Sequence, residues 1–227
     1  MFTVSNFKDS KLSWLNDPTS YNVEDTTGSI EGSGGHFDIN QDGSELKFSP
    51  PAFKDFWCRT FYEPLLIKTD GSGLLCTIPN EFEATIKVDF SYIPISQFDQ
   101  AGLLLYLNDS HWLKCGIEYC DGSPRMSVVC CNEFSDWSTQ PWASCGARLR
   151  VHKIHQSSSL VVEAAPLNSE SYQVIRIAHL STVSTVNGES QSGGGSEAVN
   201  QPEKPWRIGP FAACPTKQQG CVATFTS

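Results

Sequence analysis

Three short β-segments joined by tight polar turns run from Phe98 to Ser138, and they constrain the fold more than any other part of the chain. The even-numbered positions of the middle segment are Trp112, Lys114, Gly116 and Glu118. The odd-numbered positions are Leu113, Cys115, Ile117 and Tyr119. Because successive side chains of a strand point to opposite faces, one face of this strand needs an apolar core and the other presents polar groups.

Strand-like segments continue along nearly the whole chain, and turn sequences such as Asp70-Gly71-Ser72-Gly73 separate them. No window keeps a helical period long enough for a helix of about ten residues. Many short strands at regular spacing predict an all-β sandwich or barrel. The length of 227 residues is compatible with one such domain spanning residues 1–227.

Two segments read as long loops. Residues 28–43 are rich in glycine, serine and aspartate. Residues 184–205 contain almost no apolar side chain and include Gly193-Gly194-Gly195, which predicts a flexible loop between two late strands. Too little chain follows this second loop to form another core, so we expect a single domain.

Charge and composition limit the classes of binding partner and the cellular compartment that we expect for this protein. The chain has 16 basic and 25 acidic residues, a net charge of −9, and no cluster of Lys and Arg, which argues against nucleic acid and anionic membranes. No run approaches the roughly 18 apolar residues of a membrane span, and residues 1–9 lack the apolar region of a secretory signal. The nine cysteines are then expected to be reduced, buried thiols of a cytoplasmic protein.

The polar face of the strand from Trp112 to Tyr119 is the first candidate site. Glu118, Lys114 and Trp112 place a carboxylate, an ammonium and an indole in a row. This row suits hydrogen bonding to a polyhydroxylated ligand, or general acid–base chemistry. The alternative is an ion pair between Lys114 and Glu118 on a solvated sheet face.

Side chains of other segments suit the same ligand. Trp57 and Arg59 fall on one face of a predicted strand, Phe56–Tyr62, and Tyr62 falls on the other face. An indole beside a guanidinium suits stacking against a sugar ring or another planar ligand. The alternative is that Trp57 belongs to the core and that Arg59 lies across it.

Strand ends add groups that recognise hydroxyls. Gln100 offers both a donor and an acceptor at the start of one strand, and Asp136 with Trp137 lies near the end of another. The alternative for Asp136 is a turn cap through local hydrogen bonds.

We expect no cofactor and no metal. Asp38, Asn40 and Asp42 alternate as in a calcium loop, but the closing glutamate of an EF-hand is missing. His152 and His155 have near-ligand spacing without an accompanying Cys-x-x-Cys pair. No glycine-rich phosphate loop is present, and the Glu-x-Asp-x-Glu strand pattern of retaining glucanases is absent as well.

Short motifs along the chain resemble one family. They are Asp55-Phe56-Trp57, Arg59-Thr60, Tyr62, Phe82-Glu83-Ala84-Thr85, Phe98-Asp99-Gln100-Ala101-Gly102-Leu103, Trp112 to Tyr119, Phe134-Ser135-Asp136-Trp137-Ser138, Ile208-Gly209-Pro210-Phe211 and Pro215. On these residues the chain resembles the DUF1349 family, which includes the yeast regulation-of-enolase protein and YesU-like proteins. The resemblance implies a concanavalin-A-like antiparallel β-sandwich of the jelly-roll type and no settled activity. The family often has histidine at the position of Phe61, so a possible proton carrier is absent here.

Two functions remain open. The first is a binding module whose concave polar and aromatic face takes a carbohydrate or small metabolite, or a metabolic-enzyme partner as the resemblance implies. The second is a small-molecule enzyme, such as a lyase, isomerase or cyclase, with Glu118 and Lys114 as acid and base. The walls of its pocket are expected to be Trp57, Tyr62, Trp112 and Trp137. A closed pocket with a perturbed pKa at Glu118 distinguishes a site from an open polar surface.

Overall fold

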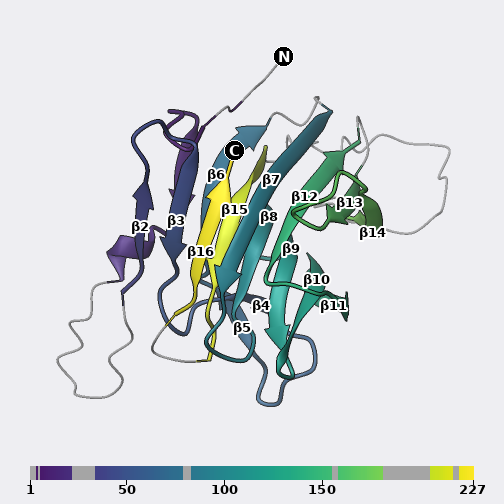
Figure 1. Cartoon of the computed structure of the whole chain (residues 1–227). Coiled ribbons are helices and arrows are strands. Elements are labelled where there is room, and N and C mark those ends of the chain that lie inside the picture. Colours follow the sequence, from purple (N-terminus) through teal and green to yellow (C-terminus); the bar gives the residue numbers. More distant parts are fainter. Residues whose placement is uncertain are drawn as a thin grey trace, which may run out of the picture.

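The computed structural model describes residues 4, 6–21, 34–78, 83–154, 158–180, 205–216 and 220–227. In these residues two seven-stranded antiparallel sheets pack face to face (Figure 1). In spatial order the first sheet contains β1 (Leu12–Leu15), β6 (Ser72–Ile78), β15 (Trp206–Ala213), β8 (Gln100–Asn108), β9 (His111–Cys120), β10 (Ser123–Asn132) and β11 (Phe134–Pro141). The second contains β14 (Gln173–His179), β13 (Ser159–Ala165), β12 (Gly146–Lys153), β7 (Ala84–Ile93), β16 (Val222–Thr226), β3 (Glu45–Ser49) and β2 (His36–Ile39).

The last two strands of the chain are interior strands of the sandwich. Strand β15 lies between β6 and β8 in the first sheet, and β16 lies between β7 and β3 in the second (both yellow in Figure 1). The C-terminal segment therefore contributes to both sheets.

The main core fills the space between the two sheets. Leu113, Cys115 and Ile117 of β9 are at most 1% exposed and belong to one apolar cluster with residues of the second sheet such as Phe90 and Leu149. These are three of the four odd-numbered positions of the predicted apolar face, which is thereby confirmed as the core face, while the fourth, Tyr119, is half-buried and lies outside the cluster. The even-numbered positions point to the outer face of the first sheet.

A second apolar cluster covers part of this outer face. A two-stranded sheet, β4 (Phe56–Cys58) with β5 (Ile67–Thr69), supplies Phe56 and Cys58, which pack with Trp112 and Leu104 of the first sheet. The Phe56 and Trp112 rings have their centroids 5.7 Å apart. The segment around β4 and β5 therefore covers part of the polar face of β9.

Element boundaries depart from the sequence-based expectation at three places. The segment from Phe98 to Ser138, expected to form three strands, contains the four strands β8 to β11, of which β11 continues to Pro141. The predicted strand Phe56–Tyr62 ends at Cys58, because Arg59 and Phe61 adopt φ values of 61° and 76°, which interrupt an extended strand. Strand β2 lies within the predicted loop 28–43, of which residues 28–33 are outside the described residues. The predicted loop 184–205 lies outside them except for its last residue.

The described helical structure is one turn of 3-10 helix, η1 (Pro18–Ser20), which the side chain of Asp17 caps by accepting from the Thr19 amide. No helix in the described ranges is long and apolar enough to cross a membrane. All nine cysteines are free thiols, and all of them except Cys145 are buried.

Candidate functional site

A cavity of about 850 Å³ opens on the outer face of the first sheet, between β9 to β11 and the segment that contains β4. Its lining residues are Asp55, Trp57, Thr60, Phe61, Tyr62, Leu66, Phe98, Lys114, Glu118, Ser135, Asp136, Trp137, Pro215 and Thr216. This size lies within the usual range for small-molecule sites.

Strand register brings the sheet residues of the cavity together. Lys114 of β9 lies opposite Val129 of β10, and Val129 lies opposite Trp137 of β11. Side chains that are directly opposite in an antiparallel sheet share one face, so Lys114 and Trp137 both point outward. Gln100 of β8 lies opposite Glu118 in the same way.

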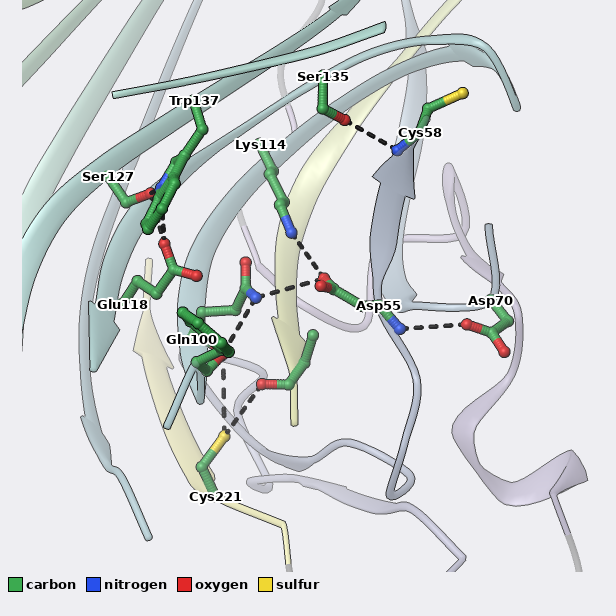
Figure 2. A network of polar contacts seen from close by, with 12 residues as sticks. Asp55, Cys58, Asp70, Gln100, Lys114, Glu118, Ser127, Ser135, Trp137 and Cys221 are labelled. Atoms are coloured by element: carbon green, nitrogen blue, oxygen red, sulfur yellow. Dashed lines mark hydrogen bonds and ion pairs between the residues drawn. The ribbon is translucent and has the colours of Figure 1, made fainter. Parts of the chain in front are cut away.

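An ion pair forms one part of the floor. The Lys114 ammonium donates to Asp55 Oδ1 over 2.6 Å, and the side chains are 4% and 12% exposed. Gln100 Nε2 donates to the same oxygen over 3.3 Å, and the Asp55 amide donates to Asp70 Oδ1 over 3.1 Å. Figure 2 shows Lys114 and Gln100 both directed at Asp55. The predicted alternative, a solvated pair between Lys114 and Glu118, is wrong, because Lys114 is buried and pairs with Asp55.

Glu118 forms the other part of the floor and is 6% exposed. Its Oε2 accepts hydrogen bonds from Ser127 Oγ over 2.8 Å and from Trp137 Nε1 over 3.0 Å (Figure 2). Burial raises the pKa of Glu118 above the usual range of a glutamate, although the charge of Lys114 and these hydrogen bonds act in the opposite direction. The described residues supply no hydrogen bond to Oε1, which leaves this oxygen for a ligand.

Replacing Glu118 with glutamine is expected to remove a pH-dependent loss of stability. The folded-state pKa is raised, so the folded protein holds a proton that the unfolded chain releases above its pKa of about 4.3. Stability contributed by the protonated carboxyl is therefore present at low pH and is lost as the pH rises through the folded-state pKa. Denaturant unfolding of both proteins between about pH 4 and pH 8 should show Glu118→Gln gaining stability relative to the wild type as pH rises. A difference that stays constant across this range would contradict the assignment.

Aromatic side chains form the walls of the cavity. The Trp57 ring lies edge-on to Tyr62 and to Trp137, with centroids 5.7 Å and 6.4 Å away and interplanar angles of 80° and 82°. Phe98 lies 6.3 Å from Trp137 at 79°. The Trp57 indole donates to the Thr60 carbonyl over 2.9 Å, and the Cys58 amide donates to Ser135 Oγ of β11 over 2.9 Å. These bonds fix the orientation of Trp57 and attach its strand to the sheet.

The structure brings most of the predicted site residues to one place. Lining the cavity are Trp57, Tyr62, Lys114, Glu118, Asp136 and Trp137. Tyr62 reaches the same side as Trp57, against expectation, because the positive φ values at Arg59 and Phe61 break the strand alternation. Gln100 lies beneath the cavity as a partner of Asp55. Asp136 pairs with Arg176 over 2.5 Å and remains exposed.

Arg59 and Trp112 do not line the cavity. The Arg59 guanidinium donates to the Glu133 carbonyl over 3.1 Å and lies over the Phe134 ring, since the left-handed backbone at Arg59 redirects its side chain. Trp112 is fully buried beneath Phe56, and its indole donates to the Asp109 carbonyl. Trp112, which was predicted to form a wall of the pocket, is therefore not in the lining, and Phe98 and Phe61 line the cavity in addition to the predicted aromatic residues.

Asp55, Ser127 and Ser135 are site residues that the sequence argument missed. One signal pointed to Asp55: a lysine in the middle of a central strand needs a carboxylate partner if its face is covered. The partner lies 59 positions away in the chain, and strand alternation does not reveal it.

Among the described residues, no three or more His, Cys, Asp and Glu side chains gather in a group suited to a metal ion. The side-chain oxygen of Asn40 accepts a hydrogen bond from the Glu45 amide, and that of Asp42 accepts one from the Ser44 amide. The calcium-like spacing therefore corresponds to a hydrogen-bonded turn.

Comparisons with known proteins give a family and a fold. A family model described as "Protein of unknown function (DUF1349)" matches residues 36–227. Regulation of enolase protein 1 from Saccharomyces cerevisiae is 32% identical over 139 residues, which are 61% of this chain and 59% of that protein. The match thus spans less than two thirds of this relative.

Among solved structures, a functionally unknown protein from Saccharomyces cerevisiae superposes with a TM-score of 0.72 at 24% identity, covering 98% of this chain and 96% of the other. A xylan beta-1,4-xylosidase from Bacillus halodurans C-125 superposes with a TM-score of 0.56 at 11% identity, covering 80% of this chain and 32% of the enzyme. These likenesses concern the fold alone. The architecture is the concanavalin-A-like β-sandwich that the sequence motifs implied.

Proposed function

The chain belongs to the DUF1349 family, and we propose that its aromatic cavity over Lys114 and Glu118 binds a carbohydrate or another small polar metabolite. One observation carries this proposal: a cavity of about 850 Å³ has five aromatic side chains in its lining and three buried polar groups, Asp55, Lys114 and Glu118, at its floor. Apolar walls with a few fixed polar groups are typical of sites that orient a small ligand.

A catalytic role is the second candidate, and one observation favours it. Glu118 combines a raised pKa with an oxygen that no described residue occupies, which suits a general acid. Lys114 is less suited to act as the base, because an ammonium paired with Asp55 has no free lone pair. An enzyme of the lyase, isomerase or cyclase type needs a second titratable group opposite Glu118. The binding function needs none, so we favour it.

The yeast relative supports one further element of the proposal. Its printed name concerns the regulation of enolase, so a metabolic enzyme is a candidate protein partner of this chain in the cytoplasm.

A thermal-shift screen against sugars and small metabolites tests the proposal. A ligand at 100 times its dissociation constant should add about 2.7 kcal/mol of stability to the wild type. Trp57→Ala removes a wall of the cavity and should abolish the shift, measured from its own unliganded midpoint. Val174→Ala is the matched control, since Val174 is 59% exposed on β14 of the other sheet and should leave the shift intact.

Two results would count against a small-ligand site here. One is the absence of any shift across the panel for the wild type. The other is an equal shift in Trp57→Ala, which would place the ligand elsewhere. Analysis of products after incubation with a binding ligand then decides between binding and catalysis.

A further inference from the structure

The charges around the cavity are arranged against anionic ligands. Lys114 is the one cationic side chain among the described lining residues, whereas Asp55, Glu118 and Asp136 are acidic. Asp55 lies 2.6 Å from the Lys114 ammonium and neutralises it. Arg176 pairs with Asp136 and is not part of the lining. A phosphate or carboxylate entering this cavity would lose its hydration without meeting an uncompensated positive charge among the described lining residues, since Arg125, which lies opposite Glu118 on β10, is not one of them and donates to Thr139 Oγ1.

The floor has a notch that fits a small group. Between Lys114 and Glu118 the outward-facing position of β9 is Gly116, and the residue opposite it on β8 is Gly102. A space of about 10 Å³ lies beside Gly116, lined among others by Lys114, Gly116, Glu118 and Ser127. A space of this size holds roughly one water molecule. It admits a hydroxyl group and is too small for a phosphate.

Hydrogen-bonding capacity on the two sides of the notch is complementary. The Lys114 ammonium has three N–H donors, of which Asp55 takes one. Glu118 Oε1 has no partner among the described residues and can accept a hydrogen bond when the carboxyl is ionised. A hydroxyl both donates and accepts, so it can bond to both sides at once whether Glu118 is ionised or protonated, whereas a carboxylate or a fully ionised phosphate can only accept and so cannot bond to an ionised Glu118.

We propose that the ligand is an uncharged sugar that places one hydroxyl in the notch between Lys114 and Glu118 and packs its ring against the aromatic wall formed by Trp57 and Trp137. Phosphorylated and carboxylated sugars are disfavoured by charge, because Lys114, the one cation among the described lining residues, is paired with Asp55. This inference rests on the proposed binding function and narrows it to one class of ligand.

Matched sugars test the inference on the wild-type protein. Saturation-transfer NMR and calorimetric titration compare glucose, galactose, mannose and xylose with glucose 6-phosphate, glucose 1-phosphate and glucuronate. At least one neutral sugar is expected to bind, and its charged counterparts are expected to bind at least tenfold more weakly. If a charged counterpart binds equally or more tightly, the inference is overturned while the proposed small-ligand site stands. If no compound of either class binds, the inference fails, and the thermal-shift screen against other small metabolites decides whether the proposed site stands.

Asp55→Asn supplies a second arm, because it uncovers the charge of Lys114 while keeping the shape of the side chain. In the folded variant, confirmed by circular dichroism, the affinity for the phosphorylated sugars should rise at least tenfold relative to the neutral sugars. A folded variant without this change in preference would overturn the charge argument. If the variant does not fold, the wild-type comparison alone decides.

Discussion

Replacing Asp55 with alanine is expected to lower the free energy of unfolding by about 3–5 kcal/mol, because it leaves a buried ammonium without its partner. Lys114 is 4% exposed at the side chain, and its hydrogen bond in the described structure goes to Asp55. The same carboxylate accepts from Gln100, so the loss also leaves a buried amide donor with one partner fewer. Guanidinium unfolding at pH 7 measures the change.

A double-mutant cycle separates the ion pair from a general packing effect. Asp55→Ala combined with Lys114→Met removes both charges, and the double variant should be more stable than Asp55→Ala alone. Glu45→Ala is the surface control: it removes a carboxylate 3.5 Å from the exposed Lys47 and should change stability by about 1 kcal/mol or less. If Asp55→Ala costs no more than this control, Lys114 does not depend on Asp55.

Replacing Gly116 with alanine should destabilise the fold by about 3 kcal/mol or more, since overpacking here acts on backbone. A Cβ at Gly116 would lie 2.0 Å from the Ala101 carbonyl oxygen, and one at Gly102 would lie 2.0 Å from that of Cys115. Strands β8 and β9 would have to separate at the floor of the cavity. The midpoint of thermal unfolding should therefore fall by many degrees.

Gly122 provides the matched control on the turn after β9. Its φ is 77°, and a Cβ there would meet no atom within 4 Å. Gly122→Ala should lower the free energy of unfolding by only about 1 kcal/mol, which is the cost of placing alanine in the left-handed conformation. Equal losses of stability in Gly116→Ala and Gly122→Ala would show that the close approach of β8 and β9 is not the reason why position 116 requires glycine.

The sequence predicted the features that depend on local alternation. The pattern of β9 gave its core face and its polar face correctly, because a period of two needs no knowledge of neighbouring strands. It also placed Lys114 and Glu118 on one face, where both line the cavity. The family motifs added the concanavalin-A-like architecture.

Features that depend on long-range packing were not predictable in this way. Trp112 shares the face of Lys114, but its burial depends on Phe56, which comes from a distant segment. The pairing of Lys114 with Asp55 depends on the same segment around β4, which covers this part of the sheet. The left-handed backbone at Arg59 ends the strand that the sequence pattern predicted to continue to Tyr62. Alternation therefore identified the floor of the site, and tertiary packing determined its walls.

A crystal structure of the protein soaked with a saturating mixture of neutral monosaccharides tests the central claim most directly. The account predicts ligand density inside the cavity, with a ring packed against Trp57 and Trp137 and one hydroxyl within hydrogen-bonding distance of Lys114 Nζ and Glu118 Oε1. Density that lies only on another face of the sandwich, or a cavity that stays filled with ordered water alone, would contradict it.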